Sequence, residues 1–276
     1  MLVNLKEILN KAADGDYAVA GFNVYGYEDA EAVISAAEDL KCPVILMTNK
    51  DAVEHMPVEL LGLLLCKMAK DSSIEICVHL DHSNSLSMIE RAINSGFTSV
   101  MFDGSQLPLV ENILRTKKVV ALAKMHNVSV EAEIGSVGYS DPAITARAEY
   151  TDPGEAELFE VETEVDALAV AVGTVHRMTT QGAKLDFDLL DRIQKKVGAP
   201  LVIHGSSGIA DEDLKKLVNS RVAKVNLGTS LRMAFGNTLR QEIQEKPNEF
   251  DRIKLFKKPM IRVQEEAKKK MQLLGN

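Results

Sequence analysis

The chain has 276 residues, of which 46% are hydrophobic and 26% charged, so it can bury a substantial core. A formal net charge of −8 argues against nucleic acid or an anionic membrane as a partner, because both need a clustered positive surface. The few cysteines are scattered without CxxC spacing, which is typical of a reduced cytoplasmic protein without disulfides or a thiolate zinc site: Cys42, Cys66 and Cys77.

The N-terminal half of the chain alternates helical and extended patterns. It lacks a basic segment followed by a long apolar block, so we expect neither a signal peptide nor a membrane span. Apolar residues at helical spacing predict helices at 4–13, 28–40, 60–69, 86–94 and 108–126. Apolar, β-branched runs predict strands at 17–24, 43–48, 74–78, 99–104 and 128–135.

The same alternation continues in the C-terminal half after one interruption. Residues 136–150 show little periodicity, and the length of this segment indicates a functional or mobile loop. Helices are then predicted from Pro153, at 187–197 and at 211–218, and strands at 167–173, 200–203 and 222–226. Residues 231–274 read as mostly helical.

The alternation as a whole predicts a single domain. Eight strands separated by helices, with no linker or low-complexity segment, favour one closed (β/α)8 TIM barrel over residues 1–276, with a C-terminal helical extension. A doubly wound open sheet is the competing fold.

Polar side chains stand at the C-terminal ends of these predicted strands, where the active sites of parallel α/β proteins lie. The pair Asp81 and His82 follows a β-branched, mostly apolar run, and the complete set is Asn23, Asp81, His82, Asp103, Glu131, Glu133, His176, His204 and Asn226. A closed barrel would bring these ends together on one face. Three imidazoles with an open fourth position form the ligand set of a catalytic zinc, whereas the alternative is three unrelated structural histidines.

The remaining histidines have other predicted places. His55 falls in a polar loop and His126 at a helix end, so both are expected to be solvated. His79 precedes Asp81 by two residues, which puts both on one side of a strand and predicts a supporting position behind a metal ligand.

Two glycine-rich turns follow the last two predicted strands, at 204–209 and 226–230. Phosphate sites of (β/α)8 barrels lie after strands seven and eight, where backbone N–H groups can reach an anion. The alternative is that glycine only makes a tight turn. Two such turns beside a predicted metal ligand favour a phosphate site.

With these motifs in place, the sequence resembles the class II, zinc-dependent ketose-bisphosphate aldolases, which include the fructose- and tagatose-bisphosphate enzymes. The matching segments occur in family order over nearly the whole chain: Gly21-Phe22-Asn23, His79-Leu80-Asp81-His82, Met101-Phe102-Asp103-Gly104-Ser105, Val130-Glu131-Ala132-Glu133-Ile134-Gly135, Gly173-Thr174-Val175-His176, His204-Gly205-Ser206-Ser207-Gly208 and Asn226-Leu227-Gly228-Thr229.

The resemblance implies a role for each matching residue. His82, His176 and His204 would bind a catalytic Zn²⁺, and Asp81 would act as acid and base on the C4 hydroxyl. Asp103 and Glu133 match positions that hold a second or displaced metal, either a divalent or a monovalent cation. Asn23 would bind substrate, and the dihydroxyacetone phosphate half would be held by two segments: Gly205, Ser206, Ser207 and Asn226, Leu227, Gly228, Thr229.

Three positions depart from the family pattern. Arg177 stands where the family usually has glycine after its second zinc ligand, so its side chain changes the charge and the room at a substrate-binding position. Asp141 is the nearest substitute for the loop glutamate that moves the C3 proton, with a shorter reach. Ser230 replaces the Asp of fructose-type and the Glu of tagatose-type enzymes.

The predicted function is therefore a cytoplasmic, zinc-dependent aldolase of carbohydrate metabolism. It would cleave a ketose 1,6-bisphosphate of the fructose or tagatose type, as in glycolysis, to dihydroxyacetone phosphate and an aldehyde, with zinc as the Lewis acid. The resemblance implies a homodimer or homotetramer. The alternatives are an aldolase for an unusual ketose 1-phosphate, suggested by Arg177 and Ser230, and a non-catalytic barrel that binds a sugar phosphate.

Overall fold

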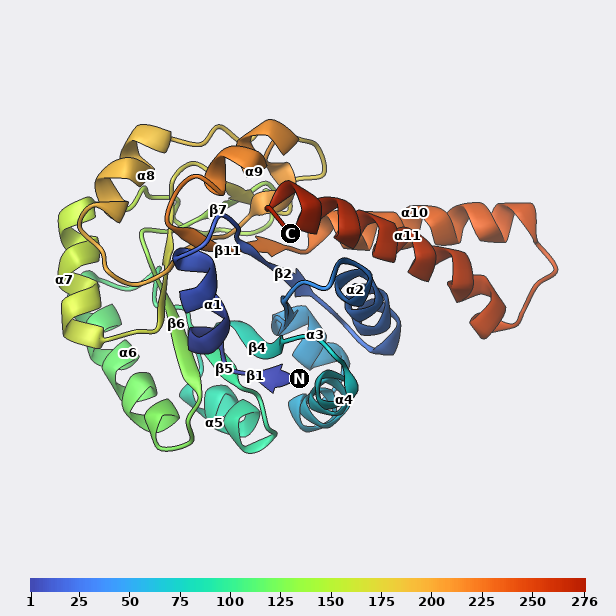
Figure 1. Cartoon of the computed structure of the whole chain (residues 1–276), viewed down its shortest axis with the longest axis horizontal. Helices are drawn as coiled ribbons and strands as arrows, with labels where there is room; N and C mark the ends of the chain where they lie inside the picture. Colours follow the sequence, from blue (N-terminus) through green and yellow to red (C-terminus); the bar gives the residue numbers. More distant parts are fainter.

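The centre of the molecule is a closed ring of parallel strands, seen in a computed structural model that describes residues 1–276 (Figure 1). The first ring strand pairs with the last, with Gly21 opposite Asn226, so the sheet has no open edge and the predicted (β/α)8 barrel is confirmed. The ring strands are β2 (Val19–Asn23), β3 (Val44–Thr48), β4 (Ile76–Ser83), β5 (Ser99–Phe102), β6 (Ser129–Ile134), β8 (Ala167–Val170), β10 (Leu201–Ile203) and β11 (Val222–Leu227).

Helices surround this ring, as expected for the connections between parallel strands. They are α1 (Leu5–Ala13), α2 (Tyr27–Leu40), α3 (Lys50–His55), α4 (Val58–Asp71), α5 (Leu86–Asn94), α6 (Leu109–Lys124), α7 (Pro153–Thr163), α8 (Phe187–Gln194), α9 (Asp211–Leu217), α10 (Thr229–Glu245) and α11 (Arg252–Leu273). The prediction of a loop at His55 is wrong, because His55 is the last residue of the short helix α3. Its side chain is exposed, as expected.

Short extended segments lie outside the ring. β1 (Leu2–Val3) pairs with β4, and β7 (Gly138–Tyr139) pairs with β9 (Val175–His176). The β7–β9 ladder joins the irregular segment 136–150 to the residues that precede and include His176. It therefore fixes the start of this segment close to a predicted metal ligand.

Alternation of side chains along the strands divides the barrel into an inner and an outer layer. In β4, Val78 and Leu80 pack outward in the main hydrophobic core, whereas Cys77 packs inward against α1. The apolar face of α1 closes the end of the barrel where the strands begin, with Leu5, Ile8 and Leu9 fully buried. The opposite end, where the strands finish, is left for the polar residues.

Helices α10 and α11 form a hairpin that projects from one side of the barrel (Figure 1). The C-terminal half of α11 returns to the barrel, where the buried Lys270 lies 3.2 Å from Asp211 at the start of α9. No helix, not even α11 with its 22 residues, is apolar over a length that would cross a membrane.

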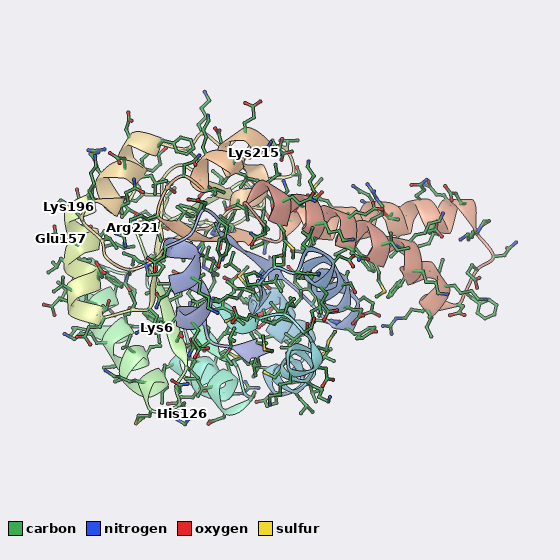
Figure 2. The ribbon with its side chains drawn as sticks, in the orientation of Figure 1. Lys6, His126, Glu157, Lys196, Lys215 and Arg221 are labelled. Carbon is green, nitrogen blue, oxygen red and sulfur yellow. The ribbon has the colours of Figure 1, made fainter.

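Charged side chains cover the outer faces of the peripheral helices and point away from the barrel (Figure 2). Glu157 of α7 and Lys196 after α8 form one surface ion pair at 2.7 Å. His126 is exposed beyond the end of α6, as the sequence predicted. These outer faces are ordinary solvated surface, and the polar residues of interest lie inside the ring.

Candidate metal centre and active site

The end of β4 delivers the first part of the site. Cys77, His79 and Asp81 alternate with the outward-packed residues and therefore point into the barrel. His82 follows with a left-handed backbone, φ 52°, which turns its ring toward the same cavity although it adjoins Asp81 in the chain. This departure from regular strand geometry places two functional groups side by side.

The three histidines from distant parts of the sequence meet at this end of the barrel. The ring centroid of His82 lies 5.0 Å from that of His176 and 4.5 Å from that of His204. One ring nitrogen from each lies within 4.8 Å of the other two. The structure thus brings together the three predicted zinc ligands, which come from β4, β9 and the residue after β10.

Carboxylates surround the histidines. The Nδ1 atom of His82 lies 2.7 Å from Asp103 Oδ2, and the Nδ1 atom of His204 lies 2.9 Å from Glu133 Oε2. His82, Asp103 and Glu133 form a second group whose ligand atoms lie within 4.8 Å of one another. The two residues predicted for a second metal therefore lie beside the histidine cluster and share His82 with it.

This charge environment acts strongly on His82. Burial favours the neutral ring, but the carboxylates of Asp81 and Asp103 outweigh burial and raise the pKa of His82 to about 10. The same pairing holds the pKa of Asp103 well below its usual range against the opposing effect of burial. A divalent cation would satisfy the same carboxylates in place of that proton.

Behind His204 lies a buried ion pair that sequence reasoning did not find. The Nε2 atom of His204 is 2.9 Å from Glu131 Oε1, and Lys224 Nζ is 2.7 Å from the other Glu131 oxygen. All three side chains are fully buried. Glu131 therefore orients the ring of His204, and Lys224 balances the carboxylate charge inside the barrel.

His79 lies inside the barrel between the apolar end and Asp81. Its Nδ1 atom is 2.8 Å from Ser99 Oγ, and its Nε2 atom has no hydrogen-bond partner but lies 3.8 Å from Glu131. Burial first, and then the positive charge of Lys224, lower the pKa of His79 to about 3, so the ring is neutral. The predicted supporting position of His79 thus fits this place behind the cluster.

Asp81 is held by two amide side chains. Asn23 Nδ2 donates to Asp81 Oδ2 at 2.8 Å, and Asn226 Nδ2 donates to Asp81 Oδ1 at 3.2 Å. Burial opposes the charged form, but the neighbouring His82 and Lys224 lower the pKa of Asp81 below its ordinary value. The carboxylate is therefore ionised and fixed in orientation next to the histidines, as a proton acceptor must be.

Asp81, His82, Asp103 and His176 line a cavity of about 470 Å³ at the carboxyl ends of the strands, whereas His204 and Glu133 are buried and lie outside its wall. Gly205, Gly228 and Thr229 form part of its wall, and Thr229 begins α10, whose first N–H groups have no helical partner. Gly205 has φ 65° and lies so close to Val175 that a Cβ atom would clash with the backbone. Glycine at 205 is therefore required for packing against β9, and the feature of this wall that suits an anion is the N-terminus of α10.

Other residues of the predicted phosphate site lie just behind this wall. Ser206 is buried and donates to the carbonyl of Ile203, whereas Ser207 Oγ accepts from the N–H of Ser230 at 3.3 Å. Ser230 Oγ is itself buried without a partner. The side chain of Leu227 packs in the main core, so only its backbone can face the cavity.

Asp141 does not join the cluster. It is absent from the cavity wall, accepts from the N–H of Ala143 at 3.0 Å and lies 3.8 Å from Arg177. Tyr139 lines the cavity instead, and its ring centroid is 4.8 Å from that of His176. Burial, followed by the nearby Asp103 and Glu133, raises the pKa of Tyr139 to about 12, so its hydroxyl is protonated.

The donor set fits a catalytic divalent ion. Catalytic zinc sites in enzymes commonly use three histidine ligands. Here three imidazoles lie with their ligand atoms within 4.8 Å of one another, and the surrounding carboxylates favour a positive charge among them. Both ring nitrogens of His204 lie 2.9 Å from carboxylate oxygens, Nδ1 from Glu133 and Nε2 from Glu131, so a metal would replace one of these contacts while the other orients the ring.

Comparison with known proteins gives a consistent result. The family model of class II fructose-bisphosphate aldolases matches residues 3–276. The crystal structure of the YdjI aldolase from Escherichia coli K12 is similar, with 33% sequence identity over 100% of this chain and 98% of that chain, and a TM-score of 0.88. A fructose-bisphosphate aldolase from Campylobacter jejuni shares the fold, with 20% identity over 99% and 95% of the two chains and a TM-score of 0.85.

Proposed function

The chain belongs to the class II fructose-bisphosphate aldolase family, whose members are metal-dependent lyases of sugar phosphates, and on this basis we propose that it is a zinc-dependent aldolase. The proposed reaction cleaves a ketose 1,6-bisphosphate of the fructose or tagatose type to dihydroxyacetone phosphate and an aldehyde. The observation that carries the proposal is the convergence of His82, His176 and His204 beside the ionised Asp81.

His82, His176 and His204 would hold the ion, which would draw electrons from the ketone and stabilise the charge left at C3. Asp81 is the residue that would accept and donate the proton. Held by Asn23 and Asn226, its carboxylate removes the C4 hydroxyl proton in cleavage and returns a proton to the aldehyde oxygen in condensation.

The phosphate of the dihydroxyacetone half would lie against the glycine turns. Gly205, Gly228 and the N-terminus of α10 offer backbone N–H groups and a positive dipole end on one wall of the cavity. The buried, unpartnered hydroxyl of Ser230 adds a polar group in the same segment. Binding here would fix the C1 end of the ketose while Asp81 acts at C4.

Further parts of the proposal follow from the family alone. We propose a cytoplasmic homodimer or homotetramer, with Asp103 and Glu133 available to a second divalent or a monovalent cation. The rival substrate class is a ketose 1-phosphate whose far end is not a phosphate, which Arg177 and Ser230 favour because they differ from the usual residues near that end.

A panel of ketose phosphates, assayed with and without a chelator, tests the proposal. We expect cleavage of a ketose 1,6-bisphosphate that stops on chelation and returns when zinc is added back. Activity that survives complete removal of metal would contradict the zinc proposal. A higher kcat/KM on a ketose 1-phosphate without the second phosphate would favour the rival substrate class.

A non-catalytic sugar-phosphate binding barrel is separated by a second measurement. The zinc-loaded aldolase should exchange the C3 hydrogen of dihydroxyacetone phosphate with solvent. Binding without exchange would leave the protein as a binding barrel.

A further inference from the structure

Tyr139 brings a phenol to the histidine cluster from the mostly irregular segment 136–150. The β7–β9 ladder sets Tyr139 directly opposite His176, and the N–H of the next residue, Ser140, donates to the carbonyl of His176 at 3.0 Å. The ring centroids of Tyr139 and His176 are 4.8 Å apart. The backbone pairing and the ring contact therefore hold Tyr139 in place beside a proposed zinc ligand.

The hydroxyl of Tyr139 is free to meet a substrate. Tyr139 lines the cavity, and no protein group makes a hydrogen bond with its oxygen. Burial, and then the negative charges of Asp103 and Glu133, raise its pKa to about 12, so the hydroxyl carries its proton. A protonated phenol without a protein acceptor can donate a hydrogen bond and can act as a general acid.

The carboxylate that the sequence suggested for the C3 proton lies elsewhere. Asp141 is outside the cavity wall, and its side chain is 40% exposed. It accepts from the N–H of Ala143 at 3.0 Å and lies 3.8 Å from Arg177, which does line the cavity. Of the titratable side chains in 136–150, only Tyr139 lines the cavity.

Tyr139 and Asp81 reach the histidines from different sides of the ring. Asp81 belongs to β4 and is held by amides of the adjoining strands β2 and β11. The partner of Tyr139, β9, follows β8 in the chain, and β5 and β6 stand between β8 and β4 in the ring. Cleavage needs two proton transfers at neighbouring carbons, because a proton leaves the C4 hydroxyl and another is added at C3. Two groups on different sides of the cluster can serve the two carbons separately.

We propose that Tyr139 is the general acid of the cleavage reaction and delivers the proton that C3 receives. Asp81 takes the C4 hydroxyl proton and later releases it to solvent. The C3–C4 bond breaks, and its electron pair remains at C3. The O–H bond of Tyr139 then breaks as its proton moves to C3, and the phenolate recovers a proton from solvent, to which Tyr139 is partly exposed. This inference rests on the proposed aldolase function and assigns the second proton transfer of that reaction.

Tyr139→Phe tests the inference because it removes the hydroxyl and keeps the ring that lies against His176. With the preferred ketose phosphate, we expect kcat for cleavage to fall by about 10²–10⁴, the usual contribution of a positioned acid. Exchange of the C3 hydrogen of dihydroxyacetone phosphate with solvent should fall by the same factor, since it uses the same proton transfer in reverse. Zinc content, measured by elemental analysis, should not change.

Tyr150→Phe is the matched control. Tyr150 is an exposed tyrosine of the same segment and does not line the cavity. Cleavage, exchange and zinc content of this variant should equal those of the wild-type protein.

A second readout separates loss of the acid from general damage to the site. When the proton is not delivered, the electron pair persists at C3, where two equivalents of hexacyanoferrate(III) can remove it. The ratio of hexacyanoferrate reduction to dihydroxyacetone phosphate release should rise about tenfold or more in Tyr139→Phe, because bond cleavage continues while protonation is slow. The ratio should stay at the wild-type value in Tyr150→Phe.

The outcomes that would overturn the inference differ from failure of the aldolase function. If Tyr139→Phe exchanges the C3 hydrogen at the wild-type rate, or if Asp141→Asn alone stops the exchange, another group delivers the proton. An unchanged ratio in a slow Tyr139→Phe variant would mean that the hydroxyl positions the site and transfers no proton. If the wild-type protein with zinc bound neither cleaves a ketose phosphate nor exchanges the C3 hydrogen, the aldolase function itself fails.

Discussion

The two ends of the barrel are made by the same strands but carry opposite kinds of side chain. At the end where the strands begin, α1 closes the ring with a cluster of 12 buried residues, nearly all aliphatic. At the end where they finish, histidines and carboxylates occupy the same inward-facing rows. In β4 the change occurs within five residues, from Cys77 through His79 to Asp81.

This difference shows how the fold separates stability from chemistry. The apolar end can pack tightly because it presents nothing to a substrate, whereas the polar end holds like charges close together that only a cation or a proton can balance. Between them lies the pair of Lys224 and Glu131, fully buried and 2.7 Å apart. Substitutions at the polar end, at the Lys224–Glu131 pair and at the apolar end should therefore change different properties of the protein.

The largest effect is expected at the polar end. His176→Ala should lose bound zinc and lower kcat at least about a thousandfold, since one of three proposed ligands is gone. Asp81→Ala should keep its zinc and lower kcat by about 10²–10⁴, the usual contribution of a positioned acid–base group. Elemental analysis of the purified variants, with steady-state kinetics, separates the two.

Both variants should still fold as metal-free proteins, because neither side chain belongs to the apolar clusters. Asp81→Ala should lose some stability, since the amides of Asn23 and Asn226 lose their acceptor. Normal zinc content in His176→Ala would contradict the ligand assignment.

The next effect is expected at the boundary. Lys224→Met leaves the carboxylate of Glu131 buried without its cation and should lower the free energy of unfolding by about 3–5 kcal/mol. Urea denaturation of the variant measures this loss.

The double variant Lys224→Met with Glu131→Gln provides the control, because it removes both charges. It should recover most of the stability but not the activity, since Glu131 also orients His204. Equal stability of the single and double variants would show that the charges are not coupled.

The smallest effect is expected at the apolar end. Ile8→Val removes one methylene from a fully buried position on α1 and should cost about 0.5–1.5 kcal/mol. The kcat and the zinc content should not change, because α1 does not reach the cavity. A lower kcat at unchanged zinc content would mean that the two ends are mechanically linked.

Part of this organisation was readable in the sequence. Alternating strand and helix patterns, with polar residues at the strand ends, predicted the barrel and the meeting of His82, His176 and His204, because strand ends in a closed barrel share one face. The helix containing His55 was missed because its six residues are too few to show an apolar period.

Contacts between loops could not be read in this way. Lys224 lies in the strand predicted at 222–226, but nothing in the sequence shows that it pairs with Glu131, 93 residues away. Tyr139 enters the cavity through the β7–β9 ladder, which two residues cannot signal. The ion pairs that Arg177 and Arg232 make with Asp51 likewise depend on the conformations of separate turns. The only signal was the arginine standing at a family glycine position.

The pairing of β2 with β11 has a consequence for synthesis on the ribosome. Since β2 emerges first and its partner β11 follows almost the whole barrel, one edge of the nascent sheet stays open until late in translation. Val19 to Phe22 are fully buried in the finished ring, so until β11 is made this edge exposes apolar side chains as well as unpaired backbone groups. The yield of native protein should therefore depend on how long that edge remains uncovered.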